Sequence, residues 1–204
     1  MNTKDKILQT ALDLFNEKGL SQVTLRTIAN QMGISQGNLC YHYNKREQII
    51  ESLYFNLAKN IDSKMEKFHQ NENLLKSLFD LSEMIMHSFY DFRFLFLDFI
   101  QVMRENDTIK EHYKQLTKQR EKEFSSILNA LIKDRIIQPE VFPKQYFNLY
   151  KRWNILGDFW ISSAYVQQGK IAKKEIKLYF EIISESIYPY LTDKGKIEYE
   201  KLNG

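Results

Sequence analysis

Proline and glycine are scarce in this sequence, with only three prolines and seven glycines among 204 residues. An all-β sandwich needs a turn about every 8–12 residues, and such turns use these two residue types heavily. Their scarcity therefore favours a fold built from helices. Hydrophobic residues make up 43% and charged residues 27% of the chain, which is typical of a folded globular protein and argues against disorder.

Cysteine and long apolar runs are also nearly missing. Cys40 is the single cysteine, which excludes an intramolecular disulfide and gives little support to a zinc site. The N-terminus lacks the continuous apolar run of a signal peptide, and charge interrupts the FLFLDFI stretch at 94–100 well before the ~20 residues that span a bilayer. We therefore expect a cytoplasmic protein without a membrane segment, a metal or a cofactor.

Neither sign of charge dominates, because 29 Lys and Arg residues stand against 26 Asp and Glu residues and the net charge is +3. Residues 1–48 hold six basic and four acidic side chains, a surplus too small to indicate nucleic-acid binding by itself. Charge permits such binding, and a stronger indication has to come from motif and placement.

Apolar residues recur at helical spacing along nearly the whole chain. A first helix is predicted at 3–18 and ends at Gly19, while Thr24 caps a second helix that continues to Met32. Ser35 caps a third helix from 36 to about 43. Further helices are expected at about 46–68, 74–90, 92–105, 107–134, 143–168 and 173–191, with a polar loop, HQNEN, at 69–73 and stops at Pro139, Pro143, Gly169 and Gly195.

The predicted fold is therefore all-α, with about nine helices in total and no sheet. A small three-helix domain occupies residues 1–46, and a connecting helix at about 46–68 joins it to a larger helical domain at 69–204. We find neither an internal repeat nor a low-complexity linker between the two parts.

The stretch GISQGNLCYHYNKRE at 33–47 joins the second and third helices through a tight glycine turn. This is the pattern of a helix-turn-helix, which lays its second helix in the major groove of DNA. Ser35 satisfies backbone amides at the start of that helix, and Gln36–Asn38 occupy its first exposed turn, where side chains can reach base edges. The far end carries side chains suited to phosphate contacts, namely Tyr41, His42, Lys45 and Arg46.

The segment TLRTIANQMGISQGNLCYHYNKREQII at 24–50 resembles the DNA-binding signature of the tetracycline-repressor (TetR) family, and the chain length and helical pattern agree with it. The resemblance implies a double-stranded DNA operator as the partner of residues 1–46. The family usually has an aromatic residue where Cys40 stands and commonly a capping residue where Lys45 stands, a cap that Asn44 can supply. The candidate DNA-binding residues are Thr24, Arg26, Thr27, Ser35, Gln36, Gly37, Asn38, Tyr41, His42, Lys45 and Arg46.

The larger domain is richer in aromatic residues than core filling requires, especially between Phe89 and Phe99 and between Trp153 and Tyr165. The resemblance implies an effector pocket among these helices, and an aromatic lining suits a small hydrophobic or aromatic molecule. The alternative for each residue is a place in the ordinary core. The candidate pocket residues are His87, Phe94, Asp98, Trp153, Asn154 and Trp160, with Asp158 as a further polar candidate.

A homodimer is expected, because one short recognition helix reads only a few base pairs and a symmetric partner supplies the second half-site. The resemblance implies that the helices predicted at 143–168 and 173–191 form a four-helix interface with the second copy. The candidate interface residues are Ile176, Phe180, Ile183 and Ile187. The predicted function is thus a homodimeric transcription regulator, a repressor that binds a pseudo-palindromic operator and is released by an unknown effector.

Two alternatives remain open from the sequence: a helical adaptor whose small domain binds protein, and a DNA-binding protein without an effector. An enzyme is not predicted. Asp80, Glu83, His87 and Asp91 recur at helical spacing, but a di-metal bundle needs a second Glu-x-x-His set on another helix, and none is present. The sequence also lacks a phosphate-binding glycine loop and a nucleophile elbow.

Overall fold

The computed structural model describes residues 2–66 and 73–203, so the loop predicted at 69–73 lies outside the described residues except for Asn73. Within these residues the fold is all-α, as predicted, although it has eleven α-helices instead of about nine. The described chain holds no strand beyond an isolated bridge between Ile137 and Leu191. None of the described helices is both long and apolar enough to cross a bilayer.

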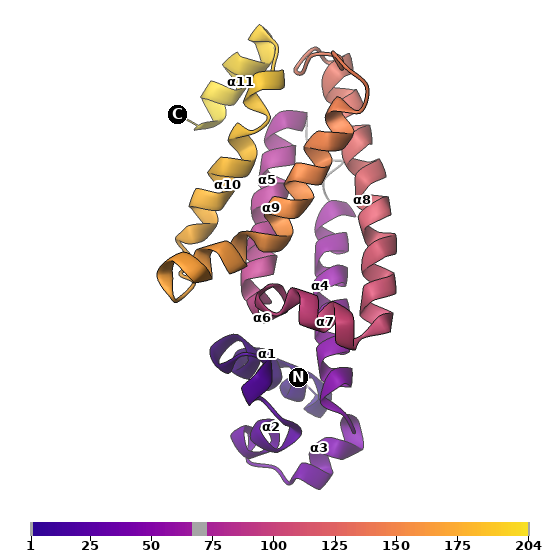
Figure 1. The fold of residues 1–204 in the computed structure, drawn as a ribbon, viewed down its shortest axis with the longest axis vertical. Coiled ribbons are helices and arrows are strands. Elements are labelled where there is room, and N and C mark those ends of the chain that lie inside the picture. Colours follow the sequence, from indigo (N-terminus) through magenta and orange to yellow (C-terminus); the bar gives the residue numbers. More distant parts are fainter. Residues whose placement is uncertain (1, 67–72, 204) are drawn as a thin grey trace.

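The molecule is elongated, with helices α1, α2 and α3 forming a head at one end and the other helices forming a body (Figure 1). Reciprocal capping boxes start two of the head helices, Asn2 with Asp5 before α1 and Thr24 with Thr27 before α2. The elements of the head are α1 (Thr3–Lys18), the 3₁₀ turn η1 (Leu20–Gln22), α2 (Leu25–Met32) and α3 (Gln36–His42). Its buried side chains are Ile7, Ala11, Leu14, Phe15, Leu20, Val23, Ile28, Ala29, Leu39 and Tyr43.

Helix α4 (Arg46–Glu66) is the predicted connection, and it runs from the head into the body (Figure 1). The sequence predicts Asn44 as its cap, but the bond present there is different. The backbone amide of Asn44 donates to the side-chain oxygen of Gln48 at 3.1 Å. The backbone just before the start of α4 is therefore held by a hydrogen bond to a side chain of the first turn of α4.

The body consists of α5 (Leu74–Asp91), α6 (Arg93–Leu97), α7 (Phe99–Glu105), α8 (Asp107–Lys133), α9 (Gln145–Gln168), α10 (Glu175–Glu185), the 3₁₀ turn η3 (Tyr188–Tyr190) and α11 (Asp193–Asn203). The prediction of one helix at 92–105 was wrong, because the backbone leaves the helical conformation at Asp98 and divides it into α6 and α7. The carboxylate of Asp98 lies 3.5 Å from the amide of Leu20, so this break faces the head.

The C-terminal helix bounds also differ from the prediction. The helix expected at 173–191 ends at Glu185, and α11 follows it without having been predicted. Gly195 was expected to stop a helix, but it lies inside α11. A Cβ at this position would overlap the carbonyl oxygen of Ile136, which explains why the residue is a glycine. Thr192 completes the contact by donating its amide to that same carbonyl at 3.0 Å. Close docking against Ile136, rather than a helix end, explains this glycine.

The head is fixed against the body where α1 meets the corner between α5 and α6. The side-chain amide of Asn16 donates to the carbonyl of Asp91 at 2.7 Å, and its oxygen accepts from the amide of Phe94 at 3.1 Å. The rings of Phe15 and Phe94 stack with their centroids 5.0 Å apart. Because one apolar cluster runs through this junction, a shift of α6 is expected to reach α1.

Candidate DNA-binding surface and internal cavity

The turn between α2 and α3 has the geometry of a helix-turn-helix. Gly33 has a φ of 68°, in the left-handed region that favours glycine. Its amide donates a hydrogen bond to the carbonyl groups of the last turn of α2. The Ser35 hydroxyl accepts a hydrogen bond from the amide of Asn38 at 3.2 Å and so caps α3. Leu39 and Tyr43 are buried beneath the helix, which leaves its opposite side facing outward.

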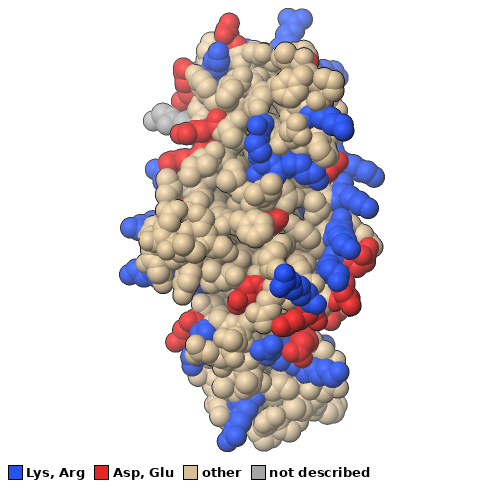
Figure 2. Space-filling view, viewed as in Figure 1, with Lys and Arg blue, Asp and Glu red and all other residues tan. Residues whose placement is uncertain are grey.

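Most of the residues predicted to contact DNA are exposed, on α3 and on the neighbouring α2. Tyr41 is 86% exposed, which is unusual for a large ring with no partner beyond an edge contact to His42. The chain carries four basic residues and no acidic residue from Lys18 to Arg46, and this end of the molecule shows basic and uncharged side chains in Figure 2. The exposed candidates are Thr24, Arg26, Thr27, Ser35, Gln36, Gly37, Asn38, Tyr41 and Lys45, while His42 is half-buried.

Arg46 is the candidate whose side chain turns inward. One guanidinium nitrogen donates to the carbonyl of Leu20 at 2.9 Å, and another lies 3.5 Å from the carboxylate of Glu47. The side chain is only 24% exposed. Arg46 therefore connects the start of α4 to the start of η1, a structural contact that the sequence pattern did not predict.

We expect Arg46→Ala to lower the free energy of unfolding by about 1–2 kcal/mol, because it leaves the Leu20 carbonyl without its charged donor. The neighbouring Lys45→Ala change is a matched control, since Lys45 is exposed and its loss should stay within about 0.5 kcal/mol. Urea denaturation of both variants measures the difference. Equal stability of the two variants would mean that the Leu20 contact does not hold the head.

The body contains a partly open cavity of about 220 Å³ between α4, α5, α8, α9 and α10. Its lining is apolar and aromatic for the most part, with Phe89 from α5, Phe124 from α8 and Trp153 from α9 contributing rings. The indole nitrogen of Trp153 points to the Ser186 hydroxyl at 2.7 Å, which fixes the ring in place. Cavities of this kind are the usual sites for small ligands in proteins.

A carboxylate lies in this otherwise apolar lining. Asp158 accepts hydrogen bonds from the Tyr113 hydroxyl at 2.5 Å and from the side-chain amide of Asn154 at 2.6 Å. Burial raises the pKa of Asp158 to about 6, and the two hydrogen bonds limit this rise. Burial and the nearby carboxylate also raise the pKa of Tyr113, so its hydroxyl stays a donor.

The structure brings only part of the predicted pocket set to this cavity. Trp153, Asn154 and Asp158 line it. Phe94 and Asp98 lie instead at the junction with the head, and Trp160 is buried against Tyr179 with ring centroids 5.4 Å apart. His87 is half-buried on α5 and is not part of the lining.

Two residues of the lining, Tyr113 and Arg120, were not predicted from the sequence. Their spacing of two helical turns placed them on one face of α8, which was the available signal.

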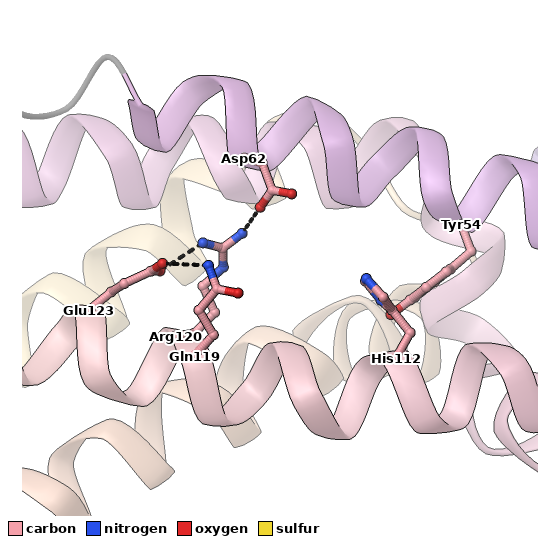
Figure 3. Close-up of polar contacts among 6 residues, drawn as sticks. All are labelled: Tyr54, Asp62, His112, Gln119, Arg120 and Glu123. Carbon is pink, nitrogen blue, oxygen red and sulfur yellow. Dashed lines mark hydrogen bonds and ion pairs between the residues drawn. The ribbon is translucent and has the colours of Figure 1, made fainter.

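Two polar contacts join α4 to α8 alongside the cavity (Figure 3). The Tyr54 hydroxyl on α4 lies 2.9 Å from Nδ1 of His112 on α8. Eight residues further along both helices, the Arg120 guanidinium pairs with Asp62 of α4. It also pairs with Glu123 of its own helix, at 2.7 Å. Arg120 also lines the cavity, so the same side chain contacts both the cavity and helix α4.

The predicted dimer residues need a correction. Ile176, Ile183 and Ile187 are at most 5% exposed and belong to the core of a single chain, and Phe180 is half-buried beside Phe79. Apolar side chains of the same helices do reach the surface on another face, which appears in Figure 2 as a broad uncharged area over α9 and α10. The exposed apolar residues of α9 and α10 are Phe147, Ile155, Phe159, Tyr165, Val166, Leu178 and Ile182.

Comparison with protein families finds two matches along the chain. Residues 7–53 match a family described as "Bacterial regulatory proteins, tetR family". Residues 56–199 match one described as "Bacterial transcriptional repressor", and this second match alone covers more than half of the chain.

Individual relatives have similar descriptions. The HTH-type transcriptional regulator YerO of Bacillus subtilis is 28% identical over 137 residues, which are 61% of this chain and 45% of YerO. IcaR of Staphylococcus epidermidis, a negative transcriptional regulator of the biofilm operon icaADBC, is 33% identical over 88 residues, 39% of this chain and 48% of IcaR. The chain thus spans about half the length of the curated relatives it matches.

The fold is similar to solved structures over its whole length. A TetR-family transcriptional regulator from Marinobacter aquaeolei superimposes with a TM-score of 0.88 at 23% identity and covers 99% of both chains. At this level of identity the likeness concerns the fold alone.

Proposed function

The chain belongs to the TetR family of bacterial regulatory proteins, and from this premise we propose that it is a homodimeric transcriptional repressor that binds a pseudo-palindromic operator and is released by a small hydrophobic effector. Members of this family are transcription regulators and not enzymes, so no catalytic role is proposed. The proposed target is DNA, which places the action of the protein in the cytoplasm.

The observation that carries the proposal is the outward face of α3. Gln36, Gly37 and Asn38 stand exposed at the N-terminal turn of a short helix that is capped, anchored from below and reached through a left-handed glycine. Side chains at this place can reach base edges in the major groove, and the acid-free segment around them favours a polyanion. Repression, rather than activation, is supported by the description of the matching family and by the negative role of the relative IcaR.

A homodimer is supported by the uncharged face over α9 and α10. Ile155 is 61% and Val166 is 82% exposed on α9, and Leu178 and Ile182 add apolar surface on α10. Apolar patches of this kind on a folded chain commonly mark an interface with another protein. A second copy would cover them and would place two recognition helices for the two half-sites of an operator.

Release by an effector is supported by the cavity and by its contacts with the elements that hold the head. Arg120 lines the cavity and binds Asp62 on α4, which continues directly into the head. A ligand that alters the position of Arg120 would therefore bias α4. The ligand can shift operator affinity by its differential binding to the two arrangements, and by no more than that.

The two alternatives predict different measurements. A helical adaptor would bind its protein partner with an affinity that changes little with salt, whereas phosphate contacts make DNA affinity fall steeply as salt rises. A DNA-binding protein without an effector would show no thermal stabilisation by any compound of a diverse panel, because a ligand that binds the folded state raises its stability.

Sequencing the genomic fragments retained by the purified protein tests the proposal directly. We expect an inverted repeat whose half-sites lie about one helical turn of DNA, 10–10.5 base pairs, or a multiple of it apart. Fragments of unrelated sequence would contradict the proposed operator, and a single unrepeated motif would contradict the symmetric dimer.

A further inference from the structure

The lining of the cavity holds few groups that could recognise charge on a ligand. Its ionisable side chains within the described chain are Tyr113, Arg120, Tyr150 and Asp158. The Tyr150 hydroxyl is already used, since it donates to the carbonyl of Thr117 at 2.8 Å. Burial raises the pKa of Tyr150 to about 12, so this group stays neutral. Recognition of charge is left to Arg120 and Asp158.

The positive charge of Arg120 is already compensated. Its guanidinium pairs with the carboxylates of Asp62 and Glu123, one from α4 and one from α8 (Figure 3). A ligand carboxylate or phosphate would have to displace one of these partners, and it would also approach the negative charge of Asp158. The cavity is therefore poorly suited to an anionic ligand.

Asp158 is in the opposite situation. Both of its hydrogen bonds, from Tyr113 and from Asn154, end on Oδ2. Among the residues that the structure describes, Oδ1 has neither a hydrogen-bond donor nor a cation as its partner. With a pKa of about 6 the carboxyl is mostly ionised at neutral pH, so a negative charge stays in an apolar lining without a counter-charge.

We infer that the cavity binds a hydrophobic organic cation, whose positively charged nitrogen pairs with Oδ1 of Asp158 while its apolar part fills the space beside Phe89, Phe124 and Trp153. The inference rests on the proposed effector site and names the class of ligand that it takes. The cation supplies the counter-charge that Asp158 lacks, and aromatic rings attract cations that have been removed from water. The volume of about 220 Å³ suits a small compound with one ring or a short alkyl chain.

Three probes on one scaffold test the class of ligand: 4-phenylbutylamine, 4-phenylbutanol and 4-phenylbutyrate. Each has a phenyl ring on a chain of four carbon atoms, and the three end in a cation, a neutral hydroxyl and an anion; in the butyrate the fourth carbon is that of the carboxylate. Titration calorimetry on the full chain without DNA should show the amine binding about 10-fold more tightly than the alcohol, because a hydrogen bond to a charged donor is worth more than one to a neutral donor. The butyrate should bind most weakly.

Asp158→Asn should abolish the preference for the amine over the alcohol. The variant is expected to fold, because the new side chain can still accept from Tyr113 and a buried charge is removed. Glu111→Gln is the matched control, since it makes the same change of charge at an exposed position of α8 and should keep the preference. A thermal unfolding transition recorded for each variant verifies that it is folded.

Several results would overturn the inference. If the amine binds no more tightly than the alcohol, or the butyrate binds best, the cavity does not prefer a cation. If the preference for the amine survives in Asp158→Asn, Asp158 is not the group that recognises the charge. Binding of none of the three probes would overturn it as well. Operator binding by the ligand-free protein is measured separately, so failure of the ligand class is distinguished from failure of the proposed regulator.

Discussion

Replacing Asn38 and Tyr41 together by alanine is expected to lower specific operator affinity by about 100-fold or more, because a base contact contributes about 1–3 kcal/mol and a phosphate contact adds to it. Both side chains lie on the outward face of α3. The free energy of unfolding should stay within about 0.5 kcal/mol of the parent, since neither side chain is part of the core. A large loss of binding without a loss of stability is the sign of a recognition surface.

The control for this variant truncates the same kinds of group at the other end of the molecule. Phe142 is 54% exposed and Asn148 is exposed, both near the start of α9 and far from the head (Figure 1). The double change Phe142→Ala with Asn148→Ala should leave operator affinity unaltered. Electrophoretic mobility shifts at several salt concentrations compare the three proteins. Parental affinity in the Asn38 and Tyr41 variant would show that α3 does not read the operator.

Local chemistry explains why the head could be predicted from its sequence. A glycine at a left-handed position, Gly33, and side-chain caps at Thr24 and Ser35 act within a few residues of themselves, so their effect is visible in the chain order. The same reasoning missed the inward turn of Arg46. Its acceptor, the Leu20 carbonyl, lies 26 positions away, and only the folded head brings the two together.

The body was harder to predict because its important contacts join distant helices. Tyr113 meets Asp158 across 45 positions, and Arg120 meets Asp62 across 58. Phe94 belongs to the junction with the head for the same reason, since the packing of α6 against α1 decides its place. Helical spacing shows which residues share a face of one helix, and it does not show which other helix that face will meet.

Helix α10 presents a further difficulty, because apolar residues occur around most of its circumference. Ile176 and Ile183 point into the core, while Leu178 and Ile182 are exposed on the same helix. These positions form one wide apolar arc, and helical spacing does not show which part of so wide an arc is buried in the core. The structure separates the part of this arc that fills the chain's own core from the part that stays at the surface.

Glutamate at two positions of the uncharged face, Ile155→Glu together with Ile182→Glu, is expected to convert the protein from dimer to monomer. Each substitution occurs once in each protomer, so a symmetric interface would have to bury four carboxylates without partners. An unpaired buried charge costs roughly 3–5 kcal/mol, and even one such penalty would raise the dimer dissociation constant by at least about 100-fold. Sedimentation equilibrium should report one chain of 24.5 kDa for the variant and twice that mass for the parent.

Loss of the dimer is also expected to weaken operator binding, although the recognition helices are untouched. In a dimer, binding of the first half-site holds the second head close to its own half-site, and this linkage can raise affinity by about 10²–10⁴-fold. Val141→Glu is the matched control, because Val141 is 78% exposed and lies outside α9 and α10. It should preserve both the mass and the affinity. A variant that stays dimeric would place the interface on another face, and a monomer with full operator affinity would remove the need for a symmetric operator.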